Sequence, residues 1–141
     1  MPERICVICR EVLTGRMRRY CSTPCHKRGE AEGWRVSEAR AQSRRYTLAD
    51  TLTLDQWLER LHYFAWKCAY CKERPAWCID HFTHVCHGGG TTADNCVPCC
   101  KACSDAKGYH HPDKWPFIPR EPIPGEDIER VRSYLSTFAV I

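Results

Sequence analysis

Residues 78–108 concentrate side chains that bind metals or transfer protons. The stretch CIDHFTHVCHGGGTTADNCVPCCKACSDAKG contains three histidines, three consecutive glycines, one asparagine and six cysteines. If Asp80 and His81 end a strand, their side chains point to opposite sides of the backbone. One can then bind a divalent cation while the other faces a water, and a neutral imidazole can take a proton from that water. The pair therefore suits hydrolysis of a phosphodiester.

Other residues of this stretch can support such a site. The run Gly88–Gly90 lets a loop turn sharply and lets a nucleic-acid backbone approach closely. Asn95 can hold a loop carbonyl or the imidazole in place. We therefore expect a hairpin in which a glycine loop joins the Asp-His strand to a return strand.

Eight cysteines fall into two sets with the spacing of zinc sites. Two cysteines separated by two or three residues supply half of a tetrahedral shell. A shell of four thiolates leaves no open coordination position, so both sites should be structural. The sets are Cys68, Cys71, Cys100 and Cys103, and Cys6, Cys9, Cys21 and Cys25, with His26 as an alternative to Cys25. The other four, Cys78, Cys86, Cys96 and Cys99, are predicted to be small buried apolar residues.

Taken together, the residues from about Leu54 to Gly108 resemble the core of HNH endonucleases, the ββα-metal nuclease fold, in its zinc-stapled form. The resemblance depends on the Asp-His pair, a double glycine seven residues after the histidine and an asparagine fourteen after it. A Val-Pro pair, the second cysteine pair and a lysine four residues beyond Cys103 follow. The N-terminal cysteines are similar to a zinc knuckle that accompanies some small bacterial and phage nucleases.

The resemblance implies a role for each residue. His81 would be the general base, Asp80 a ligand of catalytic Mg²⁺ or Mn²⁺, and Asn95 the residue that supports the hairpin. The third family position, usually His or Asn, falls on Ser104, which is a weaker metal ligand. The remaining shell could come from Asp105, His110, His111 or a water. His87 is expected to contact either the loop or a phosphate. Lys107 is expected to contact a phosphate, with a solvated helix end as the alternative, and His84 is expected to be structural.

Positive charge gathers at the N-terminal end. Residues 1–50 contain 11 Lys and Arg against 6 Asp and Glu, a net charge of +5, whereas residues 51–141 have a net charge of −1. Such a segment is either a solvated helical face or a surface for nucleic acid. The arginines predicted to contact DNA are Arg16, Arg18, Arg19, Arg44 and Arg45.

The elements that must position these residues can be read in order. We predict a zinc knuckle over residues 1–28, a basic helical connector over 29–50, the nuclease core over 51–110, and a proline-rich segment with a final helix over 111–141. A capping box at Thr53 and Gln56 starts a helix with an apolar stripe, and the last helix should run from about Glu126 to Phe138. The predicted fold class is α+β, with a small zinc-stabilised ββα-metal core and flanking helices.

Length and composition exclude several classes. The 141 residues correspond to about one domain, and we find neither an export signal nor a run long enough to span a bilayer. We therefore expect a cytoplasmic protein, in a bacterium or a phage-infected cell, whose cysteines bind metal; a secreted disulfide scaffold is the rival. A zinc deaminase is excluded, since Ala102 stands where its second cysteine must be.

The sequence thus predicts a metal-dependent endonuclease that cuts or nicks double-stranded DNA. The alternative is a non-catalytic zinc-stabilised module that binds DNA through its basic segments. A protein partner, such as a DNA-packaging or recombination complex, is left open.

Overall fold

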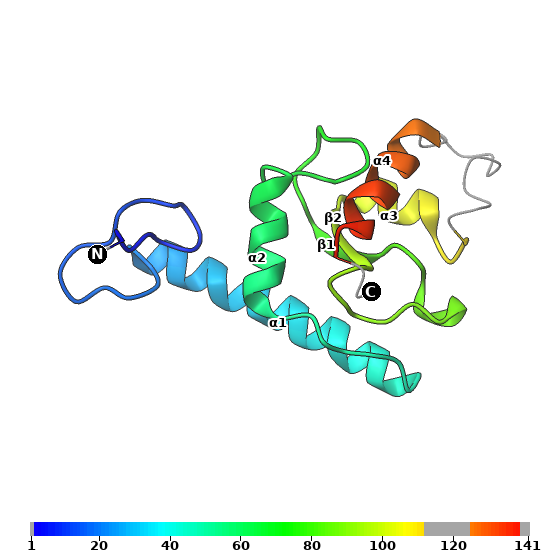
Figure 1. The fold of residues 1–141 in the computed structure, drawn as a ribbon, viewed down its shortest axis with the longest axis horizontal. Coiled ribbons are helices and arrows are strands. Elements are labelled where there is room, and N and C mark those ends of the chain that lie inside the picture. Colours follow the sequence, from blue (N-terminus) through cyan, green and yellow to red (C-terminus); the bar gives the residue numbers. More distant parts are fainter. Residues whose placement is uncertain (1, 112–124, 139–141) are drawn as a thin grey trace.

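The computed structural model describes residues 2–111 and 125–138, which form a small α+β fold. The order of the elements is α1 (Thr23–Arg45), α2 (Leu54–Tyr63), β1 (Cys78–His81), the 3-10 helix η1 (Val85–His87), β2 (Cys96–Cys99), α3 (Lys101–Lys107) and α4 (Gly125–Ser136). In Figure 1 the N-terminal knuckle lies at one end of the long α1, and the strands, α3 and α4 gather toward the other end. The predicted α+β class is confirmed.

Helix α1 joins the knuckle to the rest of the molecule. Ser22 caps its start by accepting a hydrogen bond from the backbone amide of Cys25, so the helix begins at Thr23 and overlaps the end of the knuckle, as expected for a helix from about Ser22 to Arg45. Its buried residues recur at intervals of three and four: Gly29, Glu32, Val36, Ala39 and Ser43. This spacing turns one stripe of α1 inward against α2 and β1.

Helix α2 forms where the capping box predicted it. The Thr53 side chain accepts from the Gln56 amide while the Gln56 side chain accepts from the Thr53 amide. Trp57, Leu58 and Leu61 of the predicted stripe are buried. The indole of Trp57 donates to the buried carboxylate of Glu32 at 2.9 Å, so one polar contact sets how α2 crosses α1.

The two strands pair antiparallel, with His81 opposite Cys96 and Cys78 opposite Cys99. Both faces of this hairpin are covered, because α1 contacts β1, α2 contacts β2, and residues of α3 and α4 share a core cluster with strand residues. Ile128, Val131 and Leu135 of α4 are buried in that cluster, as their helical spacing predicted. The extended segment predicted over 110–125 falls largely on residues 112–124, outside the described part.

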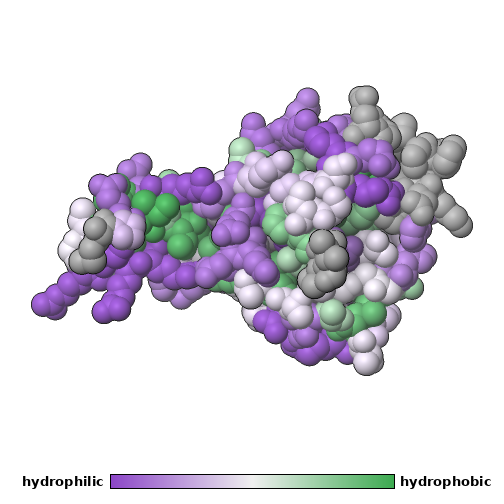
Figure 2. Space-filling view, in the orientation of Figure 1, coloured by the Kyte–Doolittle hydropathy of each residue, from purple (hydrophilic) through white to green (hydrophobic). Residues whose placement is uncertain are grey.

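The surface and the cysteines complete the description. Figure 2 shows mostly hydrophilic residues along the arm that carries the N-terminus. No helix among the described residues is both long and apolar enough to cross a bilayer. All twelve cysteines are free thiols. Cys96 and Cys99 are buried as predicted, and Cys78 is half-buried, but Cys86 is exposed because it lies on η1 at the edge of the glycine loop.

Candidate functional site

A four-cysteine cluster pins the base of the hairpin. The sulfurs of Cys68, Cys71, Cys100 and Cys103 lie within 4.8 Å of one another, as a tetrahedral zinc site requires. The turn that carries the first pair is held to β2, since the Ala69 amide donates to the Pro98 carbonyl at 2.8 Å. The second pair starts α3. The cluster is geometrically suited to structural zinc and fixes α3 relative to the strands.

The second cluster closes the N-terminal knuckle. The sulfurs of Cys6, Cys9, Cys21 and Cys25 also lie within 4.8 Å of one another, with Cys25 as the fourth member and not His26. The knuckle is attached to α2, since a ring nitrogen of His62 bonds the Val7 carbonyl at 2.8 Å. This site is likewise suited to structural zinc, and it lies at the far end of α1 from the hairpin (Figure 1).

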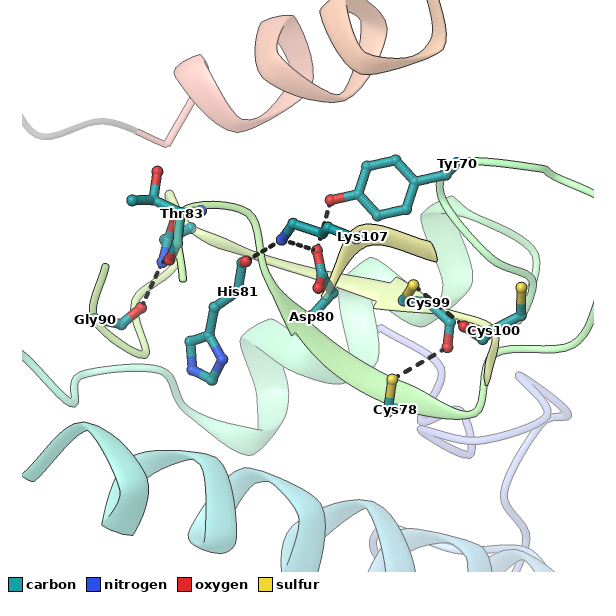
Figure 3. A network of polar contacts seen from close by, with 10 residues as sticks. Tyr70, Cys78, Asp80, His81, Thr83, Gly90, Cys99, Cys100 and Lys107 are labelled. Carbon is teal, nitrogen blue, oxygen red and sulfur yellow. Dashed lines mark hydrogen bonds and ion pairs between the residues drawn. The ribbon is translucent and has the colours of Figure 1, made fainter. Parts of the chain in front are cut away.

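His81 and Asp80 project from opposite faces of β1. In Figure 3 the His81 imidazole points toward α1, whereas the Asp80 carboxylate meets Lys107, which comes from α3. The alternation of side chains along a strand causes this arrangement, as the sequence predicted. The two side chains therefore do not lie side by side in one cleft.

The hydrogen bonds of Thr91 determine which nitrogen of His81 carries the proton. The Thr91 hydroxyl donates its single hydrogen to the Ala39 carbonyl of α1 at 2.7 Å. It must then accept from its other two partners, the Ser43 hydroxyl at 2.6 Å and Nε2 of His81 at 2.8 Å. Nε2 is therefore the protonated nitrogen, and the lone pair of the neutral imidazole is on Nδ1.

Burial keeps this imidazole neutral. His81 is only 8% exposed, and loss of hydration lowers its pKa to about 4, with Lys107 acting in the same direction and Asp80 opposing. At neutral pH the ring is thus an acceptor and not a cation. A phosphate beside it would raise this pKa, because negative charge favours the imidazolium.

His81 lies in a groove between α1 and β1. The groove has a volume of about 280 Å³ and is lined by α1 residues from Trp34 to Arg45 and by residues 77–79 and His81. Since Thr91 occupies Nε2, the nitrogen left for a molecule in the groove is Nδ1. The structure thus places the neutral ring of His81 in the lining of an open groove, with Arg45 at one end of the α1 wall.

Asp80 lies on the other face and already holds a cation. Its Oδ2 accepts from the Tyr70 hydroxyl at 2.6 Å and from the Lys107 ammonium at 2.8 Å. The same ammonium donates to the carbonyl oxygen of His81. Lys107 is 1% exposed, so both predictions for it, a surface phosphate contact and a solvated helix end, are wrong for this structure.

The donor set at Asp80 fits a hard divalent cation in kind. Mg²⁺ and Mn²⁺ prefer oxygen ligands, and here a carboxylate and a backbone carbonyl share the one cationic group of Lys107. Asp80 would hold such an ion only after the lysine side chain has moved aside. The Ser104 hydroxyl interacts with the thiol of Cys78, two residues before Asp80 on β1. Asp105 instead pairs with Lys101 on the surface at 3.0 Å.

Asn95 closes the loop that joins the strands. Its Oδ1 accepts from the Thr83 amide at 2.8 Å, and its Nδ2 donates to the carbonyls of Thr83 and Gly90 at 3.0 and 2.8 Å. Gly89 must lack a side chain, because a Cβ there would lie 1.7 Å from the Thr83 carbonyl oxygen. Asn95 thus binds loop carbonyls, which is one of its two predicted roles. The missing side chain at Gly89 makes room for the protein's own backbone at Thr83.

The remaining predicted residues lie around this loop and along the arm. His84 caps η1 by accepting from the Cys86 amide, a structural role as predicted, and His87 is exposed and bonds the Tyr109 carbonyl. Arg19 pairs with Asp55 at 2.6 Å and Arg44 with Asp50 at 2.7 Å. Within the described residues no ion-pair partner is found for the exposed Arg16, Arg18 and Arg45.

We expect Thr91→Val to separate the positioning of His81 from the packing of the loop. Valine removes the buried hydroxyl but keeps the shape of the side chain, so the free energy of unfolding should fall by about 1–3 kcal/mol. Any proton transfer by His81 should slow without a change in DNA affinity, since the tautomer is no longer imposed. Thr91→Ser retains the hydroxyl and should behave as the wild type in thermal melts and rate measurements. Equal rates for the valine and serine variants would show that Thr91 does not act through His81.

In a comparison with known proteins, no family model, curated protein or solved structure matches the chain.

Proposed function

We propose that this protein is a DNA endonuclease that hydrolyses phosphodiester bonds with His81 as general base. One observation carries the proposal: a neutral imidazole, held by Thr91 through Nε2, lines an open groove on a hairpin with cysteine pairs at its base. A buried histidine that served packing alone would not need an open groove beside it. The resemblance of the surrounding residues to HNH endonucleases supports the same reaction.

His81, Arg45 and Asp80 have separate roles in the proposed hydrolysis. Nδ1 of His81 takes a proton from the water that attacks phosphorus, and the Nε2–H bond to Thr91 keeps the ring oriented while it becomes charged. Arg45, which lines the groove, supplies positive charge for a phosphate. Asp80 lies on the other face of β1 and outside this groove, so Mg²⁺ or Mn²⁺ held there would neutralise charge only on a phosphate that also reaches that face.

A plasmid assay tests this function. Zinc-loaded protein is incubated with supercoiled DNA in the presence of Mg²⁺, Mn²⁺ or neither, and nicked and linear products are measured. We expect cleavage that needs one of the two ions and is lost in His81→Ala. DNA that stays intact under all three conditions, although the protein binds it, would instead favour the non-catalytic DNA-binding module.

Lys107→Met tests whether Asp80 can bind a divalent ion. Without the ammonium the carboxylate keeps its hydrogen bond from the Tyr70 hydroxyl, and breaking a buried ion pair in this way costs about 3–5 kcal/mol. We expect the variant to have a lower melting temperature than the wild type. Added Mn²⁺ should raise that temperature again, because an ion that binds the native state stabilises the native state. The wild type should respond to Mn²⁺ less. If Mn²⁺ leaves the melting temperature of the variant unchanged, Asp80 is not a metal ligand.

The basic knuckle gives a second, independent prediction. Arg18 is exposed without an ion-pair partner in the described structure, whereas Arg19 is held by Asp55. Each lost phosphate contact lowers the slope of log affinity against log salt by about 0.9. We expect this change for Arg18→Ala and a smaller one for Arg19→Ala, measured by fluorescence anisotropy with duplex DNA. If neither slope changes, the knuckle does not contact phosphates.

A further inference from the structure

The groove beside His81 has an exposed tryptophan in each wall. Trp34 on α1 is 66% exposed, and Trp77, just before β1, is 54% exposed. Leaving apolar area in water forgoes about 25 cal/mol per Å² of burial. Single exposed aromatic residues are common, but two in the walls of one groove indicate a binding surface.

The charges around these indoles suit a polyanion. Arg45 lines the groove without an ion-pair partner among the described residues. Lys101 of α3, which also pairs with Asp105 at 3.0 Å, places its ammonium 5.4 Å from the centre of the Trp77 ring. Arg35 also lines the groove, although one of its nitrogens is bound to the buried Glu32 at 2.6 Å. Within the described part of the chain, Glu38 is the one acidic residue that lines the groove, against the two arginines Arg35 and Arg45.

From this combination we infer that the groove binds an unpaired stretch of DNA. Aromatic side chains stack on nucleobases whatever the sequence, and basic residues follow the backbone. In a duplex both faces of a base are covered by its neighbours, so an indole can stack only on an unpaired or extruded base. The substrate is therefore DNA with locally open bases, such as a gap, a flap or a strained supercoiled region.

This inference rests on the proposed function, because it names the form of DNA that brings a phosphodiester to His81. The α1 wall extends from Trp34 to Arg45, and the β1 wall from Trp77 to His81. A strand whose bases stack on the two indoles would then continue along the groove toward Arg45 and the imidazole. The duplex on either side would remain available to the basic knuckle.

Binding is tested with zinc-loaded wild-type protein and no added Mg²⁺ or Mn²⁺, and gels verify that the DNA stays uncut. Labelled single-stranded DNA is compared with the duplex of the same sequence by anisotropy, and tryptophan fluorescence is recorded in parallel. We expect the single strand to bind at least about tenfold more tightly and to quench the fluorescence. Trp34→Ala and Trp77→Ala should each weaken it about 5- to 150-fold, since one base stack is worth about 1–3 kcal/mol.

Tyr63→Ala is the matched control, because Tyr63 is as exposed as Trp34 but lies outside the groove, stacked on Tyr134 of α4. Its affinity for single-stranded DNA should equal that of the wild type. Equal binding of single strand and duplex, or tryptophan variants with wild-type affinity, would overturn the inference. Single-strand binding without plasmid cleavage would overturn only the proposed nuclease, and cleavage with unaffected tryptophan variants would overturn only the groove.

Discussion

His81→Ala should abolish measurable DNA cleavage while zinc content and DNA affinity stay at their wild-type values. General base catalysis by one side chain contributes about 10²–10⁴-fold, and no other imidazole lines the groove among the described residues. Thr91 would keep its bond to the Ala39 carbonyl, so the loop should remain in place. Cleavage rates under single-turnover conditions give the measurement, with metal analysis and anisotropy on the same samples.

Replacing a histidine outside the groove controls for effects that follow from the loss of any histidine side chain. His26 is exposed, lies outside the groove and belongs to neither cysteine cluster, so His26→Ala should cleave at the wild-type rate. Retained cleavage in His81→Ala would remove His81 as the base. Equal losses in both variants would mean that the effect does not come from the groove.

The second large effect is expected at the cysteine cluster that pins the hairpin. Cys68, Cys100 and Cys103 belong to the core cluster that also holds residues of α4. Structural zinc binding provides about 10–16 kcal/mol in small domains, which matches or exceeds a typical net stability of about 5–15 kcal/mol. Cys100→Ser should therefore lose one of two zinc ions and unfold the hairpin. Zinc analysis and circular dichroism would record both changes.

Two other cysteine variants make this prediction specific. Cys86→Ser changes an exposed thiol outside both clusters and should retain two zinc ions and the wild-type melting temperature. Cys9→Ser should lose one zinc ion but keep the hairpin, because its cluster lies beyond the far end of α1. A wild-type protein with less than one zinc ion per chain would contradict both sites.

Some features followed from short stretches of sequence. The cysteine pairs, the capping box of α2 and the apolar stripe of α4 each depend on residues within a few positions of one another, and the hairpin joins two short strands across the single loop that holds the glycine run. Backbone geometry and side-chain periodicity act over that range, so spacing alone predicts them. The opposite orientation of Asp80 and His81 follows from the same rule for strands.

The partners of the candidate site were decided only by the tertiary structure. Thr91 orients His81 because α1 brings the Ala39 carbonyl to it across 52 residues, and no local pattern marks this threonine. Lys107 meets Asp80 because the cysteine cluster and buried apolar residues dock α3 against the hairpin. The groove with Trp34 and Trp77 likewise exists only where α1 crosses β1. Such contacts depend on how helices pack to bury their apolar faces, and packing joins residues that are distant in the chain.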